Sequence, residues 1–240
     1  MSQHILRKDL KRDEIQETLR DTAFAIFTHE QAIAWIVGIV AVVALAIFGW
    51  QTYSERQNVK ASAVFNDAMK VYNARIRTAA EPADPNEISY TADQYKYMDA
   101  AQKFGQVALA YPHTRPGQLA HYYAALSAEK VGRDDIARQW LDGMAQTHDS
   151  EFAALANFEL AQLDERAGQS DQAVRLYQGL IDRPAILVPK PVAMMALADY
   201  YSKTKPAEAT RLYNLVKTQY PNTPAAQQAT DQLGALSARS

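Results

Sequence analysis

The side chains that most often carry out chemistry form no catalytic or metal-binding motif in this sequence. The histidines show no HExxH pattern or other close spacing typical of a metal site; they are His4, His29, His113, His121 and His148. No glycine-rich phosphate loop and no GxSxG nucleophile motif occurs. Asp134 and Asp135 stand where a helix is expected to begin, so we interpret them as an N-terminal cap rather than a catalytic pair. We therefore expect no catalytic residue, no cofactor and no metal, and we interpret the histidines as surface or packing residues.

Composition excludes further classes of site. The 240 residues include no cysteine, which removes disulfides, thiolate metal ligands and cysteine nucleophiles. A formal net charge of -2 and a pI of about 6.2 do not favour a polyanionic partner, so we expect no nucleic acid. Only nine Gly and ten Pro occur, among stretches rich in residues that favour helices. These features predict an all-α protein.

Six residues that recur with a spacing of 36 form a candidate partner groove. Three of them are Tyr122, Phe158 and Met194. The other three, Glu129, Glu165 and Tyr201, each follow one of these after seven residues. If the helices that carry them stack regularly, the side chains line one wall, where a few aromatic anchors could bind an extended or helical segment of another protein. Ordinary packing between helices is the alternative for each of them. The same helices show no Lys and Asn clamp for a carboxylate.

The same spacing of 36 relates whole segments of the chain, which indicates an internal repeat. Ala137, Ala173 and Ala209 occupy the place where two antiparallel helices would approach closely and need a small side chain. An aromatic residue or Leu follows four residues later, on the same helix face. Gly132 and Gly168 lie five residues before two of the alanines, where a helix must end and turn, and Thr204 takes this place in the last copy.

These residues resemble the tetratricopeptide repeat, whose units place Gly at the turn, Ala in the second helix, an aromatic after it and Pro near the end. The first-helix Trp of that family is absent, and the period here is 36. The resemblance implies an α-solenoid of about four degenerate helical hairpins. We expect the opening helix at residues 59–77, a polar loop at 78–91, and a capping helix from Pro224 onward.

A hydrophobic segment at residues 32–50 precedes the repeats and contains no charged residue. At about 1.5 Å per residue it matches the roughly 30 Å core of a bilayer, and Trp35 and Trp50 lie near its ends. A buried core helix and a cleaved signal peptide are the alternatives. The charged tail before it is predicted to form a short amphipathic helix with Ile15, Leu19 and Ala23 on one face. We therefore expect a tail at 1–31, a transmembrane helix at 32–50 and a repeat domain at 51–240.

Basic residues on the two flanks of the span are nearly balanced, so charge alone leaves the orientation open. The order of charged tail, single span, short stalk and degenerate hairpins resembles the YfgM-like family of ancillary Sec translocon subunits. The resemblance implies a bacterial inner-membrane protein with a cytoplasmic N-terminus and a periplasmic repeat domain that contacts the translocon and periplasmic chaperones. A scaffold for envelope assembly or cell division is the alternative, and an enzyme or small-ligand sensor is the alternative of another class.

Overall fold

A computed structural model describes residues 30–78, 80–82 and 84–238. The tail helix expected through Ile15, Leu19 and Ala23 lies outside the described residues, as do His4 and His29. The described part contains nine α-helices, labelled α2 to α10, and one pair of two-residue strands. The predicted all-α class is therefore confirmed.

The first described helix, α2 (Glu30–Tyr72), is continuous over 43 residues and contains the hydrophobic segment. The chain divides into two compact units, Met1–Arg56 and Gln57–Ser240, so α2 contributes to both. In the first unit its large apolar side chains are exposed, among them Trp35, Leu45 and Trp50. In the second unit its last turns pack among aromatic rings, where Tyr72 contacts the rings of Phe104 and Tyr123.

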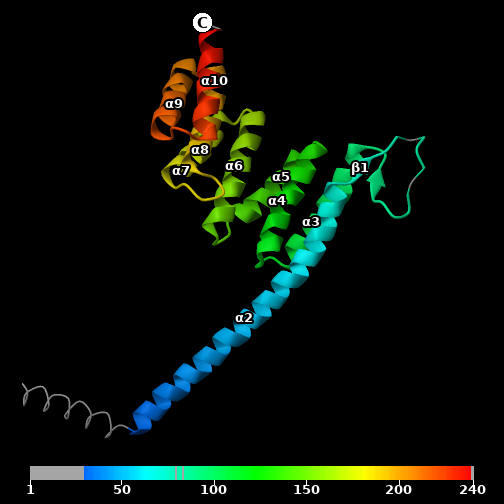
Figure 1. The fold of residues 1–240 in the computed structure, drawn as a ribbon, viewed down its shortest axis with the longest axis vertical. Helices are drawn as coiled ribbons and strands as arrows, with labels where there is room; N and C mark the ends of the chain where they lie inside the picture. The colour runs from blue at the N-terminus through cyan, green and yellow to red at the C-terminus, as the bar shows by residue number, and fades with distance from the viewer. Residues whose placement is uncertain (1–29, 79, 83, 239–240) are drawn as a thin grey trace, which may run out of the picture. The chain divides into compact units, whose positions relative to one another are not determined.

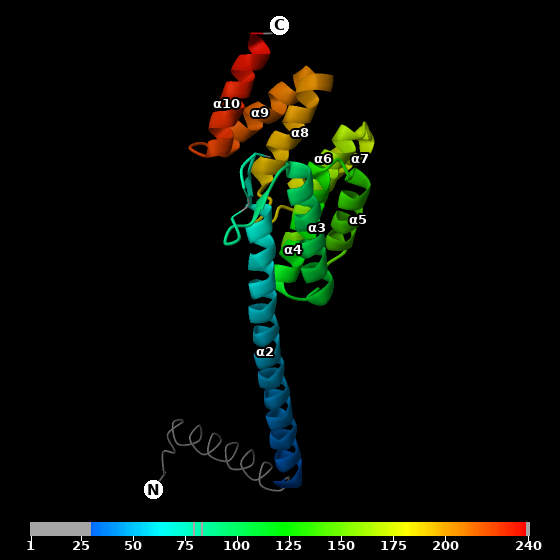
Figure 2. The same cartoon turned by 90° about the vertical axis from the view of Figure 1, so that its right-hand side faces the viewer.

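The helices of the second unit form successive hairpins. The end of α2 packs on α3 (Asp93–Ala110) through side chains such as Phe65 and Phe104. Further hairpins pair α4 (Arg115–Lys130) with α5 (Asp134–Ala145), α6 (Ser150–Arg166) with α7 (Ser170–Asp182), and α8 (Lys190–Thr204) with α9 (Pro206–Gln219). From α3 to α10, each helix contacts the next along the chain (Figure 1). The last helix, α10 (Pro224–Ser237), packs on both α8 and α9, as expected of a cap (Figure 2).

The alanines that recur every 36 residues lie in the core clusters between the helices. Ala137, Ala173 and Ala209 are each 0% exposed. Tyr177 and Tyr213, four residues after the last two alanines, are also buried. A methyl side chain lets the paired backbones approach, and the larger side chain fills the space against the next helix. The repeated pair of an alanine and a larger residue four positions later is therefore explained by the packing of the helices.

The two glycines of the repeat end their helices in the same way. Gly132 and Gly168 adopt φ angles of 72° and 73°, a left-handed conformation that residues with a Cβ rarely adopt. At the first, the Arg133 amide donates to the Ala128 carbonyl at 2.9 Å; at the second, Gln169 donates to Asp164 at 2.7 Å. These bonds satisfy carbonyls that the helix end would otherwise leave unpaired.

Burial is divided among several clusters rather than gathered in one core. One cluster joins the end of α2 with α3 and α4, another joins α4, α5 and α6, and the largest runs from α6 to α10. Each cluster therefore needs side chains from at least two neighbouring hairpins. A single hairpin could not bury its apolar face alone, which is the physical basis of repeat architectures.

The connection between α2 and α3 differs from the prediction. The opening helix ends at Tyr72 rather than Arg77, because β1 (Arg75–Ile76) leaves the helix and pairs in parallel with β2 (Ser89–Tyr90). Arg75 lies 2.8 Å from Glu81 and 3.3 Å from Glu87 in ion pairs within this loop. The polar segment at 78–91 is thus a loop closed by a short strand pair.

The start of α5 also differs from the prediction. Its N-cap is Arg133, which makes no side-chain capping hydrogen bond, while Asp134 and Asp135 lie in the first turn. Asp135 forms an ion pair with Arg133 at 3.3 Å. The two carboxylates therefore lie in the first turn, near the positive end of the helix dipole, rather than at the N-cap position.

Two glycine substitutions within the hairpin of α6 and α7 should have opposite effects on stability. Gly168→Ala forces a Cβ into the left-handed region and should lower the free energy of unfolding by about 1 to 2 kcal/mol. Gly179→Ala, inside α7 with open space around its Cα, should raise it by roughly 0.5 to 1 kcal/mol. Urea unfolding of the detergent-solubilised full chain, followed by circular dichroism, measures both. Equal stability of the two variants would contradict the assigned turn.

Candidate protein-interaction face

The six residues predicted to form a partner groove lie on the first helices of three successive hairpins. Tyr122 and Glu129 belong to α4, Phe158 and Glu165 to α6, and Met194 and Tyr201 to α8. Because α4 contacts α6, and α6 and α8 share an ion pair and a core cluster, these helices lie side by side within the second unit. We call the surface that they form the first-helix face.

Burial separates the six residues into two groups. Met194 and Tyr201 are only 3% and 9% exposed and belong to the largest core cluster, as the alternative of ordinary packing between helices expects. Tyr122 and Phe158 are half-buried against neighbouring clusters. The two glutamates are also half-buried. At α8, the first-helix face therefore lacks the two exposed side chains that the spacing predicted.

Three polar bonds run between successive first helices. The Tyr122 hydroxyl donates to Glu159 Oε1 at 2.9 Å, and Arg166 Nη2 donates to Glu129 Oε2 at 2.6 Å. Both connect α4 to α6. Lys203 Nζ donates to Glu165 Oε1 at 3.2 Å and connects α6 to α8. We call these three pairs the polar ladder.

The partners Glu159, Arg166 and Lys203 were missed by the sequence analysis. They lie 37 or 38 residues after the groups that they bind, one repeat plus one or two positions. A search for opposite charges at slightly more than one repeat would have found Arg166 and Lys203. The candidate face is therefore a set of cross-helix pairs rather than a row of independent side chains.

Within the ion pairs of the ladder, the cations extend further into solvent than the carboxylates. The Lys203 side chain is 73% exposed while its partner Glu165 is 24% exposed. The Arg166 side chain is 45% exposed and its partner Glu129 is 16% exposed. A partner protein that approaches this face would therefore meet the ammonium and guanidinium groups first.

The half-buried carboxyl groups near Tyr122 have altered acidity. Burial, followed by the nearby Glu159 carboxylate, raises the pKa of Glu129, and Arg166 only partly opposes this effect. Burial likewise raises the pKa of Glu159, against the hydrogen bond from Tyr122 and the charge of Arg166. The pKa of the Tyr122 hydroxyl is raised by burial and by Glu159. The carboxylates of Glu129 and Glu159 thus share the guanidinium of Arg166 as their close cation.

One oxygen of this cluster has no hydrogen-bond partner. Glu129 Oε1 is buried and unpaired within the described part of the chain, although Oε2 of the same carboxylate accepts from Arg166. Burying an acceptor without a partner costs free energy. An unpaired buried acceptor of this kind requires an explanation, such as a bound water or a functional role.

The histidines of the described part play no part in this face. His113 and His148 are exposed, and the ring of His121 lies 5.3 Å from that of Trp140. Burial lowers the pKa of His121. Among residues 30–78, 80–82 and 84–238, no group of three His, Cys, Asp or Glu side chains could hold a metal ion.

Removing the charge of Glu159 should stabilise the protein at neutral pH. The pKa of this carboxyl is raised above its ordinary value of 4.5, so the folded state binds the proton more tightly and loses stability as the pH rises past that value. Glu159→Gln keeps an oxygen that can accept from Tyr122. We expect a higher melting temperature than the parent at pH 7, with the difference shrinking toward pH 4.

The exposed Glu208 provides the matched control for this change. It pairs with Arg211 on the surface of α9, so Glu208→Gln should leave the melting temperature nearly unchanged across the same pH range. A melting temperature of Glu159→Gln below that of the parent at pH 7 would contradict the assigned cost of the buried charge.

Comparison with known families agrees with this architecture. A family model described as a tetratricopeptide repeat-like domain matches residues 28–183, more than half of the chain. The match includes the apolar helix and extends through α7, and the same spacing continues in α8 and α9 beyond it. Comparisons with curated proteins and with solved structures give no match. The chain belongs to the family of tetratricopeptide repeat-like domains.

Proposed function

We propose that this protein is a scaffold, anchored in a membrane by α2, that binds other proteins through its first-helix face. The observation that carries the proposal is the continuity of α2, which runs without a break from an apolar, solvent-exposed segment into the repeat unit. A tetratricopeptide-like unit typically presents a surface for other proteins rather than a catalytic site.

The anchor part of the proposal is supported by length and burial. The helix is long and apolar enough to cross a membrane, and none of its most apolar 18-residue window is buried. A row of exposed Val, Ile, Leu and Phe side chains would be unfavourable in water. The aromatic rings of Trp35 and Trp50 would lie near the two interfaces of the bilayer.

The binding part of the proposal is supported by the polar ladder. Cross-helix pairs hold Tyr122, Glu129 and Glu165 in fixed positions, while Arg166 and Lys203 extend from the same face into solvent. A face that combines ordered aromatic groups with accessible cations is suited to a polypeptide partner. A catalytic role is not part of the proposal.

At finer detail, we propose an ancillary subunit of the Sec translocon in the bacterial inner membrane, with the N-terminus in the cytoplasm and the repeats in the periplasm. Its partners would then be the translocon and periplasmic chaperones. The support for this detail is the order of tail, span, stalk and degenerate hairpins. A scaffold for envelope assembly or cell division would have the same fold and anchor and a different partner.

Single introduced cysteines test the crossing and its direction, since the chain has none of its own. We expect a membrane-impermeant thiol reagent, added to spheroplasts, to label Ser240→Cys and to label Ser2→Cys only after the membrane is opened. The opposite pattern would place the repeats in the cytoplasm. Equal labelling of both sites before the membrane is opened would contradict a crossing.

Neutralising the exposed cations of the first-helix face should reduce partner binding. We expect Arg166→Gln with Lys203→Gln to lower the amount of protein co-purified with the full chain from solubilised membranes by at least about tenfold, because each lost charge-assisted contact contributes on the order of 1.5 kcal/mol. Melting curves of the parent and the variant check that the fold is retained.

The matched control carries the same change of charge away from the first-helix face. Arg183→Gln with Lys217→Gln changes exposed cations at the end of α7 and on α9, and should leave the captured protein unchanged. Equal loss of partners in both double variants would contradict a role for the first-helix face. Quantitative mass spectrometry of the co-purified proteins measures the difference.

A further inference from the structure

A pocket of about 530 Å³ lies between the end of α2 and the start of α4, within the second unit. Three polar side chains of α2 line it at intervals of four residues, along one stripe of the helix; they are Asn58, Ser62 and Asn66. The other lining residues are Phe65 of α2 and Arg115, Pro116 and Leu119 of α4. The polar ladder begins further along α4, at Tyr122, and shares no residue with this pocket.

Arg115 brings a positive charge to the pocket that no carboxylate neutralises. Its backbone amide donates to Asn58 Oδ1 at 3.3 Å, which holds the start of α4 against α2. Its guanidinium lies 5.9 Å from the ring centroid of Phe152 and forms no ion pair or side-chain hydrogen bond within the described part of the chain. None of the seven described residues that line the pocket is an Asp or a Glu. The N–H donors of the guanidinium are therefore available to an anion.

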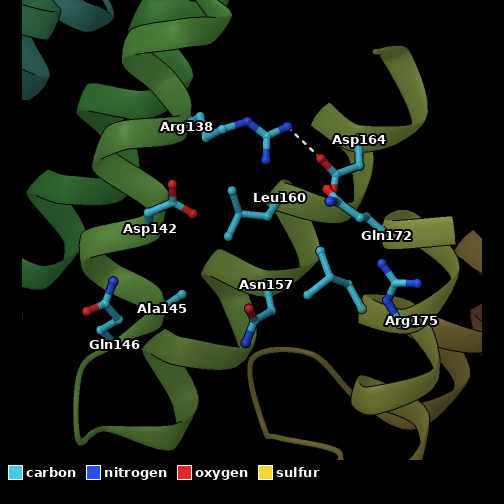
Figure 3. A pocket seen from close by; sticks show the side chains of 10 residues that line it. Arg138, Asp142, Ala145, Gln146, Asn157, Leu160, Asp164, Gln172 and Arg175 are labelled. Atoms are coloured by element: carbon cyan, nitrogen blue, oxygen red, sulfur yellow. Dashed lines mark hydrogen bonds and ion pairs between the residues drawn. The ribbon is translucent and has the colours of Figure 1, made fainter. Parts of the chain in front are cut away.

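The pocket between α5, α6 and α7 shows the contrast. Its two arginines, Arg138 and Arg175, are accompanied by two carboxylates, Asp142 and Asp164 (Figure 3). Arg138 Nη2 donates to Asp164 Oδ1 at 2.5 Å, so this cation is already paired. An anion would meet balanced charges in that pocket, whereas it would meet an unbalanced positive charge at Arg115.

The hydroxyl of Ser62 can only accept a hydrogen bond from a ligand. Its Oγ donates to the Asn58 carbonyl oxygen, one turn earlier in α2, at 2.8 Å. Because a hydroxyl has a single hydrogen, Ser62 offers the pocket its lone pairs alone. A ligand that fits this site therefore carries a negative charge for Arg115 and an O–H or N–H donor for Ser62.

The chain connects this pocket closely to the apolar segment. Asn58 follows Trp50 by eight residues, or about 12 Å along a continuous helix. The head groups of a bilayer add roughly 5 to 7 Å beyond its hydrocarbon core, so a side chain at this level can reach them. Arg56 and Lys60 are exposed on the same stretch of α2, against one carboxylate, Glu55. This excess of positive charge favours an anionic membrane surface.

We propose that the pocket between α2 and α4 binds the head group of an anionic phospholipid that carries hydroxyl groups, such as phosphatidylglycerol; the inference rests on the proposed membrane anchor. The phosphate accepts bidentate hydrogen bonds from Arg115. A hydroxyl of the head group donates to Ser62, and the carboxamide of Asn66 lies on the same stripe. Phe65 and Leu119 exclude water from one side of the phosphate, which strengthens the charged contact.

Native mass spectrometry of the detergent-solubilised full chain measures the affinity of the first lipid bound. The test lipids share their acyl chains: phosphatidylglycerol, phosphatidylmethanol with the charge but no hydroxyl, and phosphatidylethanolamine with donors but no net charge. We expect phosphatidylglycerol to bind at least about tenfold more tightly than phosphatidylethanolamine and about threefold more tightly than phosphatidylmethanol. Equal affinity for the three lipids would overturn the site. Displacement of phosphatidylglycerol by glycerol 1-phosphate at equal concentration would also overturn it, because the pocket would then bind a free phosphate ester.

Substitutions locate the bound lipid. Arg115→Gln should weaken the binding of phosphatidylglycerol about tenfold and Arg115→Lys less than that, because an ammonium cannot bind the phosphate in bidentate fashion. Ser62→Ala should remove the preference for phosphatidylglycerol over phosphatidylmethanol and leave the affinity for phosphatidylmethanol unchanged. Lys190→Gln, which removes a cation from the pocket between α7, α8 and α9, should change neither affinity. An unchanged affinity in Arg115→Gln, or an equal loss in Lys190→Gln, would overturn the site.

Flotation of the full chain after reconstitution with phosphatidylcholine vesicles separates this site from the anchor. The parent and Arg115→Gln should both float with the vesicles, and melting curves verify that each variant is folded. A parent chain that does not float would contradict the anchor and, with it, the lipid site. A chain that floats but binds phosphatidylglycerol no better than phosphatidylethanolamine would overturn the lipid site and leave the anchor intact.

Discussion

The complete burial of one repeated alanine in each of the last three hairpins is the constraint on which the rest of the structure depends. Ala137, Ala173 and Ala209 leave no surface exposed, so any larger side chain would have to separate the paired backbones. The close pairing leaves each hairpin with an apolar face that only its neighbours can cover. The need to cover this apolar face explains why the hairpins stack, why they repeat every 36 residues and why α10 covers the last of them.

The same period also places functional groups. Because successive first helices lie side by side, a side chain on one can reach a partner one repeat and one or two positions later, as Arg166 reaches Glu129. The resulting ladder orders the face but leaves half-buried carboxyl groups with raised pKa values and one unpaired oxygen. The half-buried carboxyl groups therefore lower the free energy of unfolding of the protein. Such a loss of stability is typical of surfaces that bind a partner.

Features that depend on residue size and backbone conformation were predictable from the sequence. The alanines, the glycine turns at Gly132 and Gly168 and the cap from Pro224 are all where the spacing placed them. Features that depend on contacts between distant segments were not. Two residues of β1 carry no periodic signal, and the burial of Met194 depends on how α8 is rotated against its neighbours.

The central claim is that the first-helix face meets another protein while α2 holds the chain in a membrane. Site-specific photo-crosslinking in intact cells tests it most directly, with a photoreactive residue at Lys203 on α8 or, as a control, at Lys217 on α9. The account predicts a membrane-associated adduct with another protein from Lys203 and none from Lys217. Adducts from Lys217 alone, or adducts recovered from the soluble fraction, would contradict it.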